Sequence, residues 1–299
     1  MDTDAILDRR RLKRRLTFWR LAAAVVAVAL VVLAVRVYLL PAYRPYVARV
    51  AIDDVIVEDR ERRQALLDLA DNKAVKAVIV AINSPGGSTT GSEEVFRALR
   101  RIAGSKPVVA VIGTMGASGG YIVALAADHI VARETSLTGS IGVLFRTTEF
   151  SGLLDKLGIN AESLKSSPLK GEPSPFQPMS KEARAALRAV LDDSYQWFRD
   201  LVRRRRGLEG ERLAAVADGR VFTGRQALDN GLIDALGGEE AARHWLASSR
   251  GVPESLPTVD VHWGEGPPLV NQLVGSLSEK LFSAERLRLD GLLSVWHPE

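Results

Sequence analysis

The stretch PVVAVIGTMGASGGYIVALAAD, residues 107–128, decides the fold that we expect. It begins with an apolar run typical of a buried strand, passes through a turn of glycine and other small residues, and continues as a small-residue helix. The turn holds one serine, Ser118, inside the sequence GASGG. Small neighbours leave its hydroxyl accessible to a substrate backbone. A serine hydroxyl is a weak nucleophile without a base, so the sequence must also supply that base.

The segments before this stretch repeat the alternation of strand and helix. The sequence predicts strands over 46–57 and 74–82, with an amphipathic helix over 61–72 between them. SPGGSTTGS (84–92) is predicted to break the chain before a helix over 93–104. Alternation of this kind predicts an α/β fold with right-handed crossovers.

The pattern changes at about Ser151. AESLKS (161–166) predicts a strand, and SPLKGEPSPFQP (167–178) predicts a loop because it carries four prolines in twelve residues. We expect Ser180 to cap a long helix over 181–206 that ends at a glycine.

The charge distribution argues against a nucleic-acid-binding face. The 299-residue chain has 40 Lys and Arg against 36 Asp and Glu, and its pI is about 9.4. The first 20 residues hold seven of the bases and three of the acids, so the other 279 residues balance at 33 of each. The excess charge of +4 therefore belongs to the N-terminal tail, and we expect no nucleic-acid partner. Zero cysteines exclude disulfides and thiolate metal sites, and no metal or nucleotide motif suggests a cofactor.

The basic tail and the apolar run after it predict a membrane anchor. Residues 21–35 are 15 consecutive apolar residues, which alone would also suit a cleaved signal peptide. Aromatic residues at both ends, a snorkelling Arg36 and the lack of a cleavage pattern favour an uncleaved span over 17–40. The positive-inside rule keeps the basic tail, 1–16, in the cytoplasm and sends the rest of the chain across the membrane.

Two glycine-rich segments follow two adjacent buried strands, INSPGGS (82–88) and the segment around Ser118. In a parallel sheet both would emerge at the same carboxyl edge, where sites are usually built. Backbone N–H groups of such turns can stabilise an oxyanion. Each turn taken alone is explained by the backbone geometry that glycine permits, but the pair with a serine predicts a catalytic site.

A histidine is one possible base for Ser118. Residues 116–120 match G-x-S-x-G, the nucleophile elbow of α/β-hydrolases, which requires an acid and then a histidine downstream. His129 follows Ser118 by only eleven residues, at the start of an apolar strand. The other histidines lie near or within the weakly patterned C-terminal part; they are His244, His262 and His297. The sequence therefore disfavours a histidine triad.

A lysine is the other possible base, because desolvation can bring its pKa towards neutrality. The chain has only nine lysines. Lys156 and Lys181 lie on helices where solvation is expected, which leaves Lys165 and Lys170 on either side of SSPL. The composition of this segment does not choose between the two.

Six motifs of the chain resemble those of the bacterial signal peptide peptidases. NSPGG, GASGGY, AAD-x-I, TGSIGV, LKSSPLKGEPSP and DGRVFTGRQALDNGLIDALGG occur in this order across about residues 50–246. The resemblance implies a ClpP/crotonase-like fold over 41–250, with 251–299 as an extension whose structure stays open. It also implies a serine endopeptidase that uses a Ser–Lys dyad to degrade remnant signal peptides released from secreted preproteins.

The resemblance assigns roles by motif position. Ser118 is the nucleophile, Lys170 is the general base and Ser140 helps to orient the lysine, whereas Lys165 only opens the loop. The implied oxyanion hole takes N–H groups from Gly87 and Gly119, with Gly86 shaping the turn.

The single copy of each motif resembles the short form of the family. This form implies a homo-oligomer held in the inner membrane by one N-terminal helix, with the catalytic domain on the periplasmic side and peptides as substrates. Whether Ser118 and Lys170 meet within or between chains stays open. The alternatives are a related protease with a specific membrane-protein substrate, a crotonase-type acyl-CoA enzyme, and an inactive oligomeric scaffold of the same fold.

Overall fold

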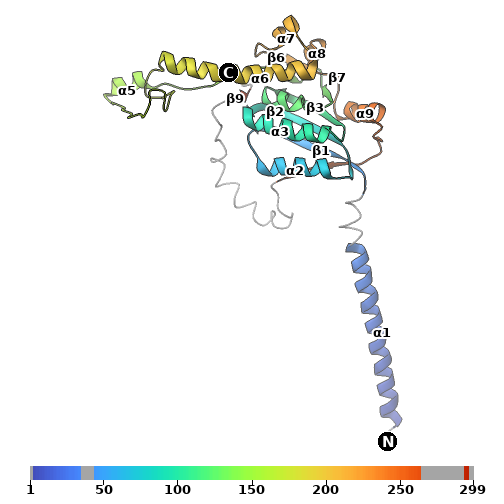
Figure 1. Ribbon diagram of the computed structural model, residues 1–299. Coiled ribbons are helices and arrows are strands. Elements are labelled where there is room, and N and C mark those ends of the chain that lie inside the picture. Colours follow the sequence, from blue (N-terminus) through green and yellow to red (C-terminus); the bar gives the residue numbers. More distant parts are fainter. Residues whose placement is uncertain (1–2, 35–43, 264–292, 296–299) are drawn as a thin grey trace. The chain divides into compact units, whose positions relative to one another are not determined.

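The computed structural model describes residues 3–34, 44–263 and 293–295. The chain divides into two units, residues 1–45 and 46–299, which are described separately. The first unit contains helix α1, Thr3–Ala34 (Figure 1). Among the described residues, α1 supplies one segment that is long and apolar enough to cross a membrane, Arg15–Leu33, with a mean hydropathy of 2.3. Residues 35–40 of the expected anchor lie outside the described residues.

The second unit is built on a mixed sheet whose central strands are parallel. Its described strands are β1 Tyr46–Ile56, β2 Val75–Ser88, β3 Val108–Ala117, β4 His129–Ala132, β5 Leu137–Gly139, β6 Val221–Thr223, β7 Ala235–Leu236, β8 Thr258–Asp260 and β9 Leu293–Val295. The order is β6-β5-β3-β2-β1-β8, with β4 beside β3 and β7, and β9 beside β2. β1, β2 and β3 pair in parallel with helices between them, which confirms the predicted α/β fold.

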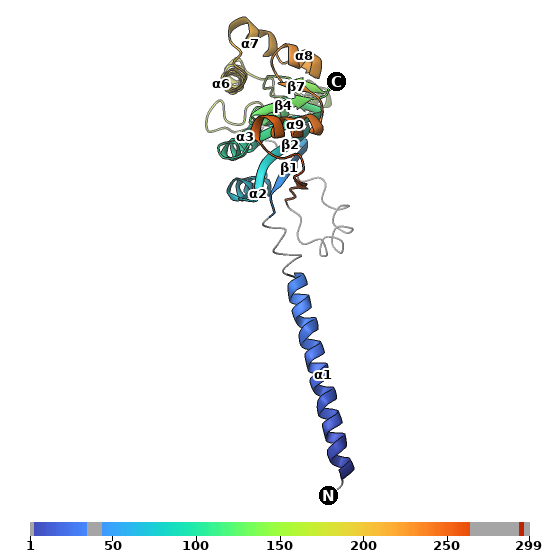
Figure 2. The ribbon, with the colours of Figure 1, turned by 90° about the vertical axis from the view of Figure 1, so that its right-hand side faces the viewer.

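Helices cover both faces of the central strands. They are α2 Arg60–Asp71, α3 Thr89–Ala103, α4 Gly119–Ala124, α5 Ser151–Leu157, α6 Lys181–Arg206, α7 Gly210–Val216, α8 Gly224–Asp229 and α9 Glu239–Arg250. Along β2, Val78 and Val80 face the core formed with α2, α3, α4 and α6, whereas Ile79 packs with Leu246 of α9. Figures 1 and 2 show α2 and α3 side by side along the sheet. The central strands read as continuous apolar runs because both of their faces are buried.

The segment SPGGS differs from the sequence prediction. The sequence predicts a turn here, but β2 continues through the segment to Ser88. Gly87 lies opposite Ile56 of β1, and a Cβ on Gly87 would lie only 1.8 Å from the Ile56 carbonyl oxygen. The glycine therefore permits a close approach of two strands and does not make a turn. As a consequence α3 begins at Thr89 and not at residue 93, with Ser88 as its N-cap.

Residues 144–180, which we call the arm, lack a core of their own. None of these residues is buried, including those of α5. The strand predicted over 161–166 is absent from the arm, because no neighbouring strand pairs with it. Figure 1 shows α5 beyond the end of the long α6, away from the sheet. The predicted start of α6 is confirmed, since the Ser180 hydroxyl accepts from the Ala183 N–H at 3.0 Å.

Part of the C-terminal extension belongs to the sheet. Strand β8 lies within 251–299 and pairs in parallel with Val47–Arg49 of β1. The Arg49 guanidinium donates to Asp260 at 2.8 Å and to Glu239 at the start of α9 at 3.1 Å. These contacts hold β8 and the start of α9 against β1.

Candidate active site

Ser118 occupies the junction between β3 and α4, where the sequence placed it. Its backbone has φ 56° and ψ −116°, a conformation that residues other than glycine rarely adopt. The Ser118 N–H donates to the Gly139 carbonyl at 2.8 Å, which holds this conformation against the end of β5. Backbone strain of this kind persists where the surrounding structure fixes it, and it concentrates at functional sites.

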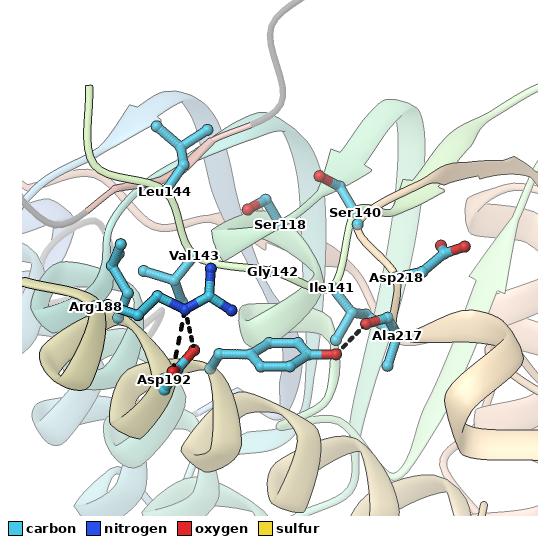
Figure 3. A pocket seen from close by; sticks show the side chains of 13 residues that line it. Ser118, Ser140, Ile141, Gly142, Val143, Leu144, Arg188, Asp192, Ala217 and Asp218 are labelled. Carbon is cyan, nitrogen blue, oxygen red and sulfur yellow. Dashed lines mark hydrogen bonds and ion pairs between the residues drawn. The ribbon is translucent and has the colours of Figure 1, made fainter. Parts of the chain in front are cut away.

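The register between strands β3 and β5 places Ser140 beside Ser118. β3 and β5 run parallel with Ala117 opposite Gly139, so the next residue of each strand is a serine. Ser140 also has a positive φ, 50°, and its N–H donates to the Arg220 carbonyl at 2.8 Å. Both serines line one cavity of about 330 Å³ (Figure 3). The structure therefore brings together the two hydroxyl groups that the motifs singled out.

Helix α6 and the segments 141–144 and 217–219 form the rest of this cavity. Its apolar wall contains Ile141, Val143, Leu144, Leu191 and Ala217, and its polar side chains are Arg188, Asp192, Tyr195 and Asp218. Arg188 and Asp192 pair along α6 at 2.9 Å, and the Tyr195 hydroxyl donates to the Ala217 carbonyl (Figure 3). Sequence reasoning missed these α6 residues, because nothing in the helix pattern marks which face meets a site 70 residues upstream.

A second cavity continues from the first along α6. It has a volume of about 650 Å³ and shares Leu144, Arg188 and Leu191 with the cavity at Ser118. Phe145, Met179 and Leu187 add apolar surface to it. The two cavities together offer a surface of mixed character beside the serines, in which these apolar side chains alternate with arginines of α6 and the arm, Arg146, Arg184 and Arg188.

Three glycines of the predicted oxyanion hole lie on two elements that meet near Ser118. Gly119 is the first residue of α4, and Gly86 and Gly87 lie in the last part of β2. A Cβ on Gly120 would lie 2.8 Å from the carbonyl oxygen of Ser84, so the start of α4 packs directly against β2.

Ser84 is a further residue that sequence reasoning missed. It is fully buried, its hydroxyl donates to the Asp54 carbonyl, and it accepts from the Gly86 N–H at 3.1 Å. Gly86 has φ 110°, which only glycine adopts readily. Ser84 and Gly86 thus shape the backbone that carries Gly87. Its place two residues after the apolar run of β2, in front of proline and two glycines, was the available signal.

Lys170 does not line the cavity at Ser118 of its own chain. Among the described residues, no lysine lines the cavity at Ser118. Lys170 lies in the arm, where its N–H closes a turn with the Ser167 carbonyl at 3.1 Å. Lys165 is paired with Glu172 at 2.6 Å, and this hydrogen bond holds the pKa of Glu172 below its usual value.

The described histidines lie elsewhere. His129 stacks on Trp245 with ring centroids 4.7 Å apart and lies 3.8 Å from Asp234. Burial lowers the pKa of His129, although the Asp234 carboxylate acts in the opposite direction. His244 is exposed beside Glu254, and His262 lines a different cavity. His297 lies outside the described residues, so no described histidine supports a triad with Ser118.

Comparisons with known proteins match most of the chain. The family model "Peptidase family S49" matches residues 100–253, and the model "Clp protease" matches residues 51–137. The Synechocystis sp. protein "Putative protease slr0021" is 37% identical over 82% of this chain and 89% of its own length. The chloroplast "Serine protease SPPA" of Arabidopsis thaliana is 31% identical over 77% of this chain and 34% of its own.

Two further matches are shorter or more distant. The Enterococcus faecium protein "Putative signal peptide peptidase SppA" is 35% identical over 59% of this chain and 52% of its own length. A solved structure of a mutant of the "1510-N membrane-bound stomatin-specific protease" is 13% identical, with a TM-score of 0.48 over 73% of this chain and 98% of its own.

Proposed function

This chain belongs to peptidase family S49, and we propose that it is a membrane-anchored serine endopeptidase whose nucleophile is Ser118 and whose general base is Lys170. The observation that carries the proposal is the backbone of Ser118. A serine held at positive φ between a strand and a helix, on the wall of a cavity, is the geometry that presents a hydroxyl for attack.

The proposed reaction is acyl transfer to Ser118 followed by hydrolysis. Neutral Lys170 takes the hydroxyl proton as Ser118 Oγ bonds to the peptide carbonyl carbon. The N–H groups of Gly87 and Gly119 stabilise the oxyanion that forms. The C–N bond then breaks, the proton passes from Lys170 to the leaving amine, and water releases the acyl group by the same steps in reverse.

Lys170 reaches Ser118 from a neighbouring copy in this proposal. The support is that Lys170 does not line the cavity of its own chain and lies in an arm without buried residues. The arm exposes large apolar side chains, among them Leu153, Leu157 and Leu164, the last 96% exposed. Apolar surface of this extent is unusual on a monomer and is expected to be covered by another subunit. A homo-oligomer would bury the arm and complete the site together.

The proposed substrates are short apolar peptides, and remnant signal peptides fit that class. The wall of Val143, Leu144 and Leu191 accepts small or apolar side chains. The name of the Enterococcus faecium relative points to the same class. Helix α1 would anchor the enzyme in the inner membrane, with the peptidase domain on the periplasmic side.

A serine-reactive phosphonate probe and an apolar fluorogenic peptide test the proposal on the full chain in detergent. We expect Ser118→Ala to lose both probe labelling and peptide cleavage. The matched control is Ser105→Ala, an exposed serine just after α3, which should keep both. Labelling and cleavage that survive in Ser118→Ala would overturn the assignment of the nucleophile.

A further inference from the structure

The second cavity, which continues from the one at Ser118, combines positive charge with apolar surface. Its described lining contains no acidic side chain and three arginines, Arg146 of the arm and Arg184 and Arg188 of α6. Arg188 also lines the cavity at Ser118, where it pairs with Asp192 at 2.9 Å (Figure 3). Arg146 and Arg184 line the second cavity and not the first, and neither side chain has an ion-pair or hydrogen-bond partner within the part of the chain that the structure describes.

The spacing along α6 brings arginine and leucine side chains to one face of the helix. The four residues at positions i, i+3, i+4 and i+7 line the second cavity; they are Arg184, Leu187, Arg188 and Leu191. Leu191 also lines the cavity at Ser118. The helix from Leu191 back to Arg184 is about 10 Å long, so Arg184 lies roughly that far along α6 from the cavity of the nucleophile.

A carboxylate on an apolar group is the ligand that matches this lining. A guanidinium group presents a planar fork of N–H donors that fits the two oxygens of a carboxylate, and the charges strengthen these hydrogen bonds. Phe145, Met179 and Leu187 offer contacts to an apolar side chain next to that carboxylate. The C-terminal residue of an apolar peptide supplies both features in one group.

We propose that Arg146 and Arg184 bind the free C-terminal carboxylate of the peptide substrate, an inference that rests on the proposed function. A signal peptide is the N-terminal part of its precursor, so its release by hydrolysis creates a new carboxylate at its C-terminus. In the uncleaved precursor the same carbon belongs to a peptide bond and carries no charge. The two arginines therefore distinguish a released peptide from an uncleaved chain, and the enzyme acts after an endoproteolytic hydrolysis.

The distance along α6 also predicts where such a peptide is cut first. An extended peptide rises about 3.3 Å per residue, so this distance corresponds to about three residues. A carboxylate held at Arg184 sets the scissile bond about that far before the C-terminus of the peptide. Mass spectrometry of the earliest products should therefore find C-terminal fragments of roughly two to four residues. First cuts spread evenly along the peptide would contradict a carboxylate held at this position.

The main experiment compares two forms of one apolar peptide on the full chain in detergent, one with a free C-terminal carboxylate and one with a C-terminal amide. We expect kcat/KM for the acid to exceed that for the amide by about 5-fold or more. The double variant Arg146→Gln/Arg184→Gln should lose this preference, chiefly through a higher KM for the acid. Because the result is a ratio within each variant, a general loss of activity does not imitate it. Equal cleavage of both forms by the wild-type chain would overturn the proposal.

Arg204→Gln is the matched control. It removes the same charge from an exposed position of α6 that lines neither cavity, and it should keep the full preference for the acid. A preference that disappears equally in Arg204→Gln would show an effect of net charge and overturn the assignment to the cavity.

A third peptide tests the other source of a carboxylate in a substrate. It is the amide with one internal glutamate, and we expect the wild-type chain to cleave it no faster than the plain amide. If it is cleaved as well as the free acid, the cavity recognises acidic side chains and the terminal assignment is wrong.

A binding measurement separates this proposal from the proposed function. Fluorescence anisotropy of the two labelled peptides on Ser118→Ala should show that the acid binds about 5-fold or more tighter than the amide. Adding Arg146→Gln/Arg184→Gln to this background should remove the difference. If no chain cleaves any peptide, the proposed function fails while this comparison still decides the inference. Equal affinities of Ser118→Ala for the acid and the amide would contradict it.

Discussion

Ser118 and Ser140 are adjacent residues of one cavity wall, and both hold backbones with positive φ, 56° and 50°. They meet because β3 and β5 pair in register up to Ala117 and Gly139, after which each strand ends at a serine. In each conformation the serine N–H donates to a neighbouring carbonyl, Ser118 to Gly139 and Ser140 to Arg220, both at 2.8 Å. Strained backbones cost stability and concentrate at functional sites, so two strained serines side by side indicate such a site.

The variant Ser140→Gly tests the role of the Ser140 hydroxyl alone, because it removes this group and leaves the backbone conformation accessible. Glycine accepts φ 50° without strain, so we expect an unchanged or higher melting temperature. If the hydroxyl orients the base, kcat falls by about 10-fold or more and KM changes little. The measurements are thermal denaturation and steady-state kinetics over a range of pH. A variant with full kcat would remove Ser140 from the mechanism.

Gly87→Ala should damage the fold, because the added Cβ would lie 1.8 Å from the Ile56 carbonyl oxygen. Strand β1 and strand β2 would have to separate, and we expect a loss of about 3 kcal/mol or more in the free energy of unfolding. Gly104→Ala is the control, since its Cβ meets nothing closer than 3.3 Å and its φ is −68°. Denaturant unfolding of both variants tests the contact. Equal stability of the two would show that β1 and β2 do not approach this closely at Gly87.

The pH dependence of the free energy of unfolding should reflect the protonation of His129. Burial lowers its pKa in the folded state below 6.5, so between these two values the unfolded chain binds more protons than the folded one. Stability therefore falls as pH drops below about 6.5, by at most about 1.4 kcal/mol per pH unit for one group. His129→Phe keeps an aromatic ring against Trp245 and should flatten this slope.

Denaturant unfolding of the wild-type chain and of His129→Phe at pH 5 to 7 measures the two slopes. A slope that stays the same in His129→Phe would assign the pH dependence to other groups.

The two lysines of the arm should behave differently. Lys170→Ala removes the proposed base and should abolish peptide cleavage to below about 1% of the wild-type kcat. Lys165→Ala removes the ion pair with Glu172, which affects the order of the arm, and should leave measurable activity. Cleavage of an apolar peptide by both variants, matched for oligomeric state, gives the comparison. The reverse result would make Lys165 the base.

The sequence predicted the central part of the fold because burial leaves a local pattern. The apolar run and the small-residue helix in 107–128 appear as β3 and α4 at nearly the expected positions. The prediction of a turn at SPGGS was wrong because the path of the backbone there is not set by the local sequence. Proline and glycine are local signals for a turn, whereas the extended path of Gly87 is imposed by its pairing with Ile56, which is distant in sequence.

Residues of the candidate site were predictable where a sequence motif marks them. They were not predictable where only tertiary packing places them at the site. Ser118 and Ser140 were named from their motifs, and the register of β3 and β5 places them together. Arg188 and Tyr195 come from α6, whose orientation over the cavity depends on tertiary contacts such as the one from Tyr195 to Ala217. The position of Lys170 relative to Ser118 was not predictable, because the arm has no buried residues within its own chain.

Complementation between two inactive variants tests the central claim most directly. Ser118→Ala and Lys170→Ala are each expected to be inactive. If the nucleophile of one copy works with the base of its neighbour, a co-expressed 1:1 mixture pairs intact partners at about a quarter of its sites by random assembly around a head-to-tail oligomer. We predict that the mixture recovers about that fraction of wild-type cleavage. A mixture as inactive as its components, in oligomers shown to contain both variants, would contradict a Ser118–Lys170 dyad formed between chains.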